Sequence, residues 1–171
     1  MSLTIEELTL QHNRKAFDCG ITELNQFLQQ QARQKNTKHI CKTYVACQDS
    51  APTLIVGYHT LTGYSVTMPP AHKDYNKYPH PLGAVKLARL AVDSSQQGQG
   101  LGERLLIDAI YRTLLVAQQI SAIGLFVDPM IPAVVPFYQQ YGFLPADPGD
   151  DSRLEMWLPI NTCIEIAEAL K

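Results

Sequence analysis

The chain has 171 residues, of which 46 % are hydrophobic and 18 % are charged, and its net charge is −2. This composition excludes a disordered chain and supplies enough apolar residues for one core, so we predict a single domain over residues 1–171. No apolar run approaches the roughly 20 residues of a membrane helix, and the first residues show no basic then apolar leader. We therefore expect a cytoplasmic protein that has no membrane contact.

Cysteine and histidine positions argue against a metal or disulfide framework. The four cysteines form no C-x-x-C pair, and the five histidines have no metal-ligand spacing. We expect reduced thiols and no metal site.

The charges are distributed unevenly along the chain. Between residues 24 and 92 the acids are only Asp49 and Asp74, whereas acids dominate from Asp93 onward. The basic residues of the middle segment are Arg33, Lys35, Lys38, Lys42, Lys73, Lys77, Lys86 and Arg89. Such a segment favours an anionic partner, a coenzyme or a nucleic acid, but a set of solvated lysines explains the same pattern.

The first 66 residues read as strand, helix and hairpin. Alternation over 3–10 predicts a strand, and an apolar face over 24–32 predicts a helix with Thr22 as a candidate N-cap and an end near Gln34. The polar residues 35–42 read as a loop. Residues 43–47 and 54–66 are rich in β-formers and predict a hairpin of antiparallel strands.

Residues 68–83 contain four prolines, which argues against a regular element. A long loop of this kind often carries substrate contacts, although a surface excursion explains it equally well.

The stretch 85–115 organises the chain. Residues 85–92 read as a strand, residues 93–102 as a loop with Gly98, Gly100 and Gly102, and the fourfold repeat of apolar residues from Leu101 predicts a helix. Helix N-termini and glycines together expose backbone N–H groups to a phosphate. The sequence therefore favours a phosphorylated ligand at 98–103, with a plain glycine-rich turn as the alternative.

Two common phosphate motifs fail here. Residue 103 is Glu where the dinucleotide fingerprint needs Gly, and no Gly-Lys-Ser/Thr ends the loop. The remaining C-terminal pattern predicts a strand over 122–127, a short helix over 132–141 that is irregular at its prolines, a strand over 153–158 and a helix over 161–170.

The pattern that fits the loop is Gln97-x-x-Gly100-x-Gly102. It resembles the coenzyme A loop of the GNAT superfamily of N-acetyltransferases, and Pro136-Phe-Tyr-Gln-Gln-Tyr-Gly-Phe143 resembles the late helix signature of the same superfamily. The residues from Phe17 to Gln34 are similar to the N-terminal signature of GNAT toxins from bacterial toxin–antitoxin pairs. The resemblance implies an α/β (α+β) GNAT fold, a mixed, mostly antiparallel twisted sheet flanked by helices.

The resemblance implies an acetyl-CoA site. Backbone amides of 98–103 would hold the pyrophosphate, the backbone of Leu90, Ala91 and Val92 would pair with the pantetheine arm, and an amide near Val92 would polarise the thioester carbonyl. The loop residues concerned are Gln97, Gly98, Gln99, Gly100, Leu101, Gly102, Glu103 and Arg104, with Gln97 and Arg104 as candidate phosphate contacts. The asparagine that many relatives place after the next strand is absent from residues 128–131.

Tyr138 stands where the family places the acid that protonates the leaving thiolate. Its alternative role is packing against Phe137 and Phe143, and Tyr141 is a rival that we interpret as structural. The general base cannot be read from the sequence.

Three functions remain open at this level. The first is a toxin that acetylates the α-amino group of aminoacyl-tRNA, with Arg33, Lys35, Lys38, Lys86 and Arg89 against the tRNA. Such toxins pair with a ribbon-helix-helix antitoxin and often form homodimers. The second is a housekeeping N-acetyltransferase for a small amine or a peptide or protein amine, and the third is a non-enzymatic GNAT-like binding module.

Overall fold

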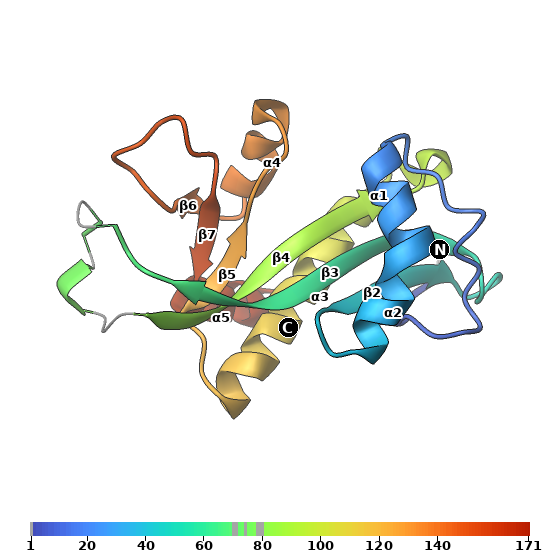
Figure 1. Cartoon of the computed structure of the whole chain (residues 1–171), viewed down its shortest axis with the longest axis horizontal. Helices are drawn as coiled ribbons and strands as arrows, with labels where there is room; N and C mark the ends of the chain where they lie inside the picture. Colours follow the sequence, from blue (N-terminus) through green and yellow to red (C-terminus); the bar gives the residue numbers. More distant parts are fainter. Residues whose placement is uncertain (1, 70–71, 74, 78–80) are drawn as a thin grey trace. The chain divides into compact units, whose positions relative to one another are not determined.

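A computed structural model describes residues 2–69, 72–73, 75–77 and 81–171. Seven strands follow one another in the sheet order β1-β2-β3-β4-β5-β7-β6. The strand pairs detailed in the described residues are antiparallel, except for the parallel pair of β4 and β5. The mixed, mostly antiparallel sheet with its helices confirms the predicted fold class (Figure 1).

The chain packs as two compact units. Unit 1 comprises Met1–Thr62 and Ala88–Ala109, and unit 2 comprises Gly63–Leu87 and Ile110–Lys171. Three elements begin in one unit and end in the other: β3 (Ile55–Val66), β4 (Leu82–Val92) and α3 (Leu101–Gln119).

Unit 1 contains the predicted hairpin and the N-terminal helix. Its further elements are β1 (Leu3–Glu7), α1 (Thr22–Gln26), the π-helical turn η1 (Phe27–Gln31), α2 (Ala32–Thr37), β2 (Lys42–Gln48) and the 3₁₀ turn η3 (Ser94–Gln96). The antiparallel pairing of β2 with β3 confirms the hairpin.

Two details of the N-terminal helix were predicted wrongly. Helical structure continues through Thr37, so the first residues of the expected loop 35–42 are helical. The N-cap is Ile21 and makes no side-chain cap bond, and Thr22 is the first helical residue. The turn before the helix is instead held by Asn25, whose Oδ1 accepts from Cys19 N (2.9 Å) and whose amide donates to Asp18 Oδ1 (2.9 Å).

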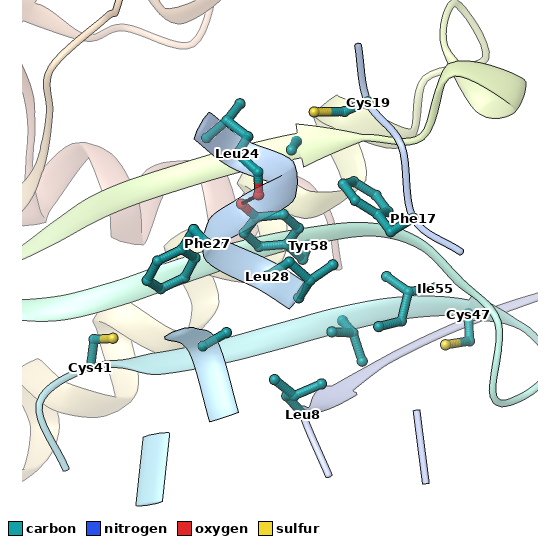
Figure 2. Packing of buried hydrophobic residues seen from close by; sticks show 13 residues of the cluster. Leu8, Phe17, Cys19, Leu24, Phe27, Leu28, Cys41, Cys47, Ile55 and Tyr58 are labelled. Carbon is teal, nitrogen blue, oxygen red and sulfur yellow. Dashed lines mark hydrogen bonds between the residues drawn. The ribbon is translucent and has the colours of Figure 1, made fainter. Parts of the chain in front are cut away.

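The core of unit 1 is built around Tyr58 of β3, which is fully buried. Its hydroxyl donates to the carbonyl oxygen of Leu24 at 2.7 Å, which satisfies the polar atom in an apolar setting (Figure 2). Phe17 meets the ring edge-on at a centroid distance of 5.5 Å, and Phe27 stacks at 6.3 Å. These contacts pack the helical segment against β3.

Unit 2 contains the C-terminal half of the sheet. Its further elements are the 3₁₀ turn η2 (Tyr75–Lys77), β5 (Gly124–Val127), the 3₁₀ turn η4 (Pro132–Val134), α4 (Val135–Gln139), β6 (Leu144–Pro145), β7 (Met156–Pro159) and α5 (Ile160–Ala169). The 3₁₀ start confirms the irregular helix predicted over 132–141. The two-residue β6 was not predicted.

The segment 68–83 lies partly outside the described residues, because 70, 71, 74 and 78–80 are not among them. Within its described part, a short 3₁₀ turn forms and β4 begins at Leu82, three residues earlier than predicted.

Candidate functional site

The glycine loop between β4 and α3 leaves its backbone N–H groups open. Gly98 and Gly100 have φ of +77° and +81°, and a Cβ built on either would meet nothing within 4 Å. The N–H groups of residues 98–103 donate to no group in the described part of the chain. Open amides at the start of a 19-residue helix suit an anion such as a phosphate.

Side chains at both ends of the loop hold it in place. Asp93 Oδ2 accepts from the backbone N–H of Asp18 (2.9 Å), and Oδ1 accepts from the N–H and hydroxyl of Ser95 (3.0 and 2.7 Å). Burial alone would raise the pKa of the Asp93 carboxyl. The hydrogen bonds from Asp18 and Ser95 outweigh burial, so the net pKa is lowered. Gln97 Nε2 donates to the carbonyl oxygens of Cys19 (3.0 Å) and Val92 (2.9 Å). The side-chain nitrogen of Gln97 therefore stabilises the loop through these two hydrogen bonds. The expected contact of Gln97 with a phosphate stays a prediction.

The predicted strand 90–92 has two differently packed faces. Ala91 belongs to the core around Tyr58, whereas Leu90 and Val92 pack against the cluster of Leu101 and Leu105 from α3. This alternation follows from the period of two in a strand and fixes the backbone of residues 90–92 between two apolar layers.

The strands β4 and β5 separate after a short parallel contact. Only Val85, Lys86 and Leu87 of β4 pair with β5, which ends at Val127, while β4 continues to Val92. We call this point, at Leu87 and Val127, the fork. Beyond the fork, the edge of β4 has backbone groups that β5 does not use, and an extended ligand can pair with such an edge.

Tyr138 lies in α4 with its ring between Phe137 (5.1 Å) and Phe143 (5.3 Å), both in edge-to-face contact. Both predicted packing contacts are therefore present. Its hydroxyl makes no hydrogen bond to the described part of the chain, unlike that of Tyr58 or Tyr64. Burial raises the pKa of Tyr138 to about 12, so the phenol keeps its proton at neutral pH. The rival Tyr141 is half-buried and meets Phe137 at 5.6 Å.

Two of the predicted substrate residues meet on one aromatic ring. The guanidinium carbon of Arg89 lies 3.6 Å from the ring centroid of Phe27, and Lys35 Nζ lies 5.6 Å from it. Neither cation forms an ion pair with a carboxylate among the described residues. We call Phe27, Lys35 and Arg89 the basic cluster. Arg33 lines a separate open hollow of about 560 Å³ beside Asn36, and Lys38 is exposed at the end of α2.

Lys86, the fifth predicted substrate residue, has a different environment in unit 2. Its Nζ lies 2.6 Å from Asp128 Oδ2, 3.4 Å from Glu155 Oε2 and 4.4 Å from the ring centroid of Tyr64. Glu155 is buried and also accepts from the Tyr64 hydroxyl (2.5 Å) and from Arg153 (3.2 Å). We call Tyr64, Lys86, Asp128, Arg153 and Glu155 the acid-rich network.

Residues 39–145 match the family described as "Acetyltransferase (GNAT) domain". The chain belongs to this family. As a member of it, the chain is an N-acetyltransferase.

Two curated relatives of this GNAT chain are named as toxins, the second as a probable one. It is 31 % identical over 140 residues to a protein named "tRNA-acetylating toxin" from Mycobacterium tuberculosis (strain ATCC 25618 / H37Rv), covering 78 % of this chain and 80 % of that protein. It is 26 % identical over 161 residues to "Probable toxin TacT" from Sinorhizobium fredii (strain NBRC 101917 / NGR234), covering 88 % and 87 %.

Solved structures give the same result for the fold. A tyrosine-to-phenylalanine mutant of KacT superposes with a TM-score of 0.88 at 27 % identity, over 97 % of this chain and 99 % of that one. AtaT complexed with acetyl-methionyl-tRNAfMet gives 0.87 at 29 % identity, over 98 % and 99 %. A tyrosine-to-phenylalanine mutant of AtaT, bound to the C-terminus of the antitoxin AtaR and acetyl-CoA, gives 0.82 at 27 %, over 98 % and 99 %.

The acid-rich network of this GNAT chain was missed in the sequence. Its members come from β3, β4, the residue after β5, and the segment before β7, so no local spacing links them. One signal in the sequence was Lys86, a cation within a mostly apolar strand pattern.

Among the described residues, no three His, Cys, Asp or Glu side chains are grouped to hold a metal ion, and no helix there is long and apolar enough to cross a bilayer.

Proposed function

We propose that the chain is a toxin that transfers the acetyl group of acetyl-CoA to the α-amino group of aminoacyl-tRNA and so stops translation. The observation that carries the proposal is the similarity over most of the chain to a tRNA-acetylating toxin, together with the TM-score of 0.87 to AtaT in complex with acetyl-methionyl-tRNA. For an enzyme that acts on charged tRNA we expect a cytoplasmic location.

The coenzyme site is assigned to the glycine loop and the free edge of β4. Backbone N–H groups of residues 98–103 would bind the pyrophosphate, and Leu90, Ala91 and Val92 would pair with the pantetheine arm. The open amides, the positive φ of Gly98 and Gly100 and the end of β5 at Val127 support this assignment. Arg104 is exposed in the first turn of α3 and can meet a phosphate.

The reaction needs one nucleophile and one acid. The acceptor ammonium first releases a proton to water, and the lone pair of the amine attacks the thioester carbonyl carbon. The new C–N bond forms, the C–S bond breaks, and the thiolate takes a proton from the Tyr138 hydroxyl. The amide nitrogen loses its second proton, which restores the phenol directly or through water, so amide, free coenzyme thiol and one proton result. The support for Tyr138 as the acid is geometric: Phe137 and Phe143 hold its ring, and its hydroxyl has no hydrogen-bond partner in the described part of the chain.

The tRNA contact is assigned to the basic cluster. Arg89 and Lys35 lie together on Phe27 without a carboxylate partner in the described part of the chain, so phosphates can neutralise them. Arg33 and Lys38 are exposed on α2 and just after it, and extend this contact. Lys86 is already paired with two carboxylates and is left out of the phosphate contacts.

A partner protein follows from the toxin assignment. AtaT is recorded bound to the C-terminus of the antitoxin AtaR. We expect an antitoxin for this chain as well, of the ribbon-helix-helix class, and a homodimer of the toxin.

The deciding experiment incubates the purified protein and labelled acetyl-CoA with bulk charged tRNA and, in parallel, with a panel of small amines. We expect label on the aminoacyl-tRNA and its loss in Tyr138→Phe, with Tyr141→Phe as the matched control that keeps transfer. Label only on small amines would instead support a housekeeping enzyme. No transfer to any acceptor, with acetyl-CoA bound, would support a binding module.

A further inference from the structure

Asn25 is a polar residue inside the short helix α1, at a position where alanine has the higher helix propensity. Its backbone belongs to the first helical turn, since its N–H donates to the carbonyl oxygen of Ile21 at 3.1 Å. Its side chain instead contacts the residues before the helix: Oδ1 accepts from the N–H of Cys19 (2.9 Å), and Nδ2 donates to Asp18 Oδ1 (2.9 Å). An amide that uses both its donor and its acceptor has one favoured orientation. Asn25 therefore fixes residues 17–20, which we call the N-terminal turn.

Gly20 closes the N-terminal turn. Its φ is +88°, in the left-handed region that costs glycine little, and its N–H donates to the same Asp18 Oδ1 at 2.9 Å. The hydrogen bonds from Gly20 and Asn25 lower the pKa of the Asp18 carboxyl. This carboxyl is therefore charged at neutral pH and accepts both bonds.

The N-terminal turn is joined to residues 93–97, which lead into the glycine loop and which we call the entry segment. Three hydrogen bonds join the two: Asp18 N to Asp93 Oδ2 (2.9 Å), Ser94 N to Asp18 O (2.8 Å) and Gln97 Nε2 to Cys19 O (3.0 Å). Both segments belong to unit 1. Backbone and side-chain groups thus hold together two parts of the chain that are far apart in the sequence.

The backbone N–H groups of the entry segment differ from those of the glycine loop. Those of residues 93–96 all donate to acceptors within unit 1, whereas those of residues 98–103 donate to no group in the described part of the chain. The open amides therefore begin directly after a segment that is fixed by hydrogen bonds. A loop that is held in this way loses less conformational freedom when an anion binds to it.

We propose that Asn25 is a positioning residue for the coenzyme. It fixes the N-terminal turn, the turn fixes the entry segment, and the entry segment presents the amides of residues 98–103 to the pyrophosphate. This inference rests on the proposed assignment of the coenzyme to the glycine loop. It gives a role to part of the N-terminal signature (Asp18, Cys19, Gly20 and Asn25) that the proposed reaction does not use.

The test compares the binding of two acetyl donors to the full chain: acetyl-CoA, and S-acetyl-pantetheine, which has the same thioester arm but lacks the pyrophosphate. In Asn25→Ala we expect the affinity for acetyl-CoA to fall about fivefold, the effect of one hydrogen bond. The affinity for S-acetyl-pantetheine should change less than twofold, because this donor does not reach the loop amides. Titrations followed by ligand NMR measure both affinities, including that of the weaker donor.

Matched variants separate this role from a general effect on the helix. Asn25→Asp keeps an acceptor for the N–H of Cys19 but places a carboxylate against Asp18, so it should also weaken acetyl-CoA binding. The double variant Asp18→Asn/Asn25→Asp moves the amide donor to the other side chain and should recover part of the loss. Gln26→Ala removes the exposed amide that follows in α1 and should bind both donors as the wild type does.

Two outcomes would overturn the proposal. One is an Asn25→Ala protein that binds acetyl-CoA with wild-type affinity. The other is an Asn25→Ala protein that loses affinity for both donors equally, because a general loss of structure does not distinguish the pyrophosphate.

A variant of the loop itself tests the coenzyme assignment separately. Gly100→Ala strains a residue whose φ is +81°, and it should weaken acetyl-CoA binding whether or not Asn25 has a positioning role. Unchanged affinity in Gly100→Ala would contradict the assignment of the pyrophosphate to residues 98–103. The binding measurements involve no acceptor, so a chain that binds acetyl-CoA but acetylates no charged tRNA would contradict the proposed function without changing their result.

Discussion

Two groups of charged side chains, one in each unit, differ in how their charges are satisfied. In the basic cluster, Lys35 and Arg89 lie on the ring of Phe27 and have no carboxylate partner among the described residues. In the acid-rich network, both cations are paired, and Lys86 touches two carboxylates. The comparison shows that a basic residue in the sequence is not by itself a nucleic-acid contact.

The difference has a simple physical basis. A guanidinium group stacked on an aromatic ring keeps its N–H donors around the rim of its plane, where a phosphate can accept from them. Before Lys86 could bind a phosphate, it would have to break its bonds to Asp128 and Glu155. The buried Glu155 would then lose a partner. Of these two groups, the basic cluster is the one that can gain a phosphate without breaking an ion pair.

The largest expected effect is a loss of stability when the acid-rich network is disrupted. Lys86→Met keeps most of the side-chain volume but removes one partner from the buried Glu155 and the anchor of Asp128. We expect the free energy of unfolding to fall by about 1–3 kcal/mol, measured by urea denaturation. The double variant Lys86→Met/Glu155→Gln should recover part of that loss, and a double variant less stable than Lys86→Met would contradict the pairing.

The pH dependence of this effect has a defined sign. Burial alone would lower the pKa of Lys86, but the hydrogen bond and the charge of Asp128 outweigh it and raise the pKa above the usual 10.5. A raised pKa in the folded state adds stability that is complete below the unfolded value and is lost as pH rises through the folded one. The stability difference between wild type and Lys86→Met should thus stay constant from pH 7 to about 9.5 and shrink above about 10.5. A difference that shrinks below pH 9 would exclude this origin.

The sequence predicted the parts of the fold that depend on local pattern. The hairpin of β2 and β3 follows from its β-formers and turn, and the glycine loop follows from three glycines between a strand and an apolar helix face. Local pattern could not give the start of α1, because the helix has no side-chain N-cap and Asn25, inside the helix, instead holds the preceding turn through Cys19 and Asp18.

Local sequence pattern also could not predict the roles of the basic residues, because these roles depend on contacts with residues that are distant in the sequence. Lys35, Lys86 and Arg89 are equivalent in the sequence as isolated cations. The environments of Lys86 and Arg89 depend on Asp128, Glu155 and Phe27, which are far from them in the sequence. Tyr138 was found because its helix signature is contiguous, and its role as the acid stays a prediction.

A smaller effect is expected from the basic cluster. Arg89→Met should keep a side chain packed on Phe27 but remove the positive charge, and with it one phosphate contact. The affinity for charged and for uncharged tRNA should therefore fall equally, by about tenfold at physiological salt. The slope of log affinity against log salt should decrease by about one. Fluorescence anisotropy across a salt series measures both, and selective loss for charged tRNA would move Arg89 to the acceptor site.

The smallest effect is expected at Lys35, which lies 5.6 Å from the Phe27 centroid where Arg89 lies at 3.6 Å. A single compact ammonium at the margin of the cluster keeps its hydration and contributes mostly through screened Coulomb attraction. Lys35→Met should weaken binding of both tRNA forms by only about two- to threefold. Lys15→Met, which removes an exposed lysine elsewhere in unit 1, is the matched control and should change affinity less. Equal losses in Lys35→Met and Lys15→Met would show that only net charge matters there, and would reduce the basic cluster to the contact of Arg89 with Phe27.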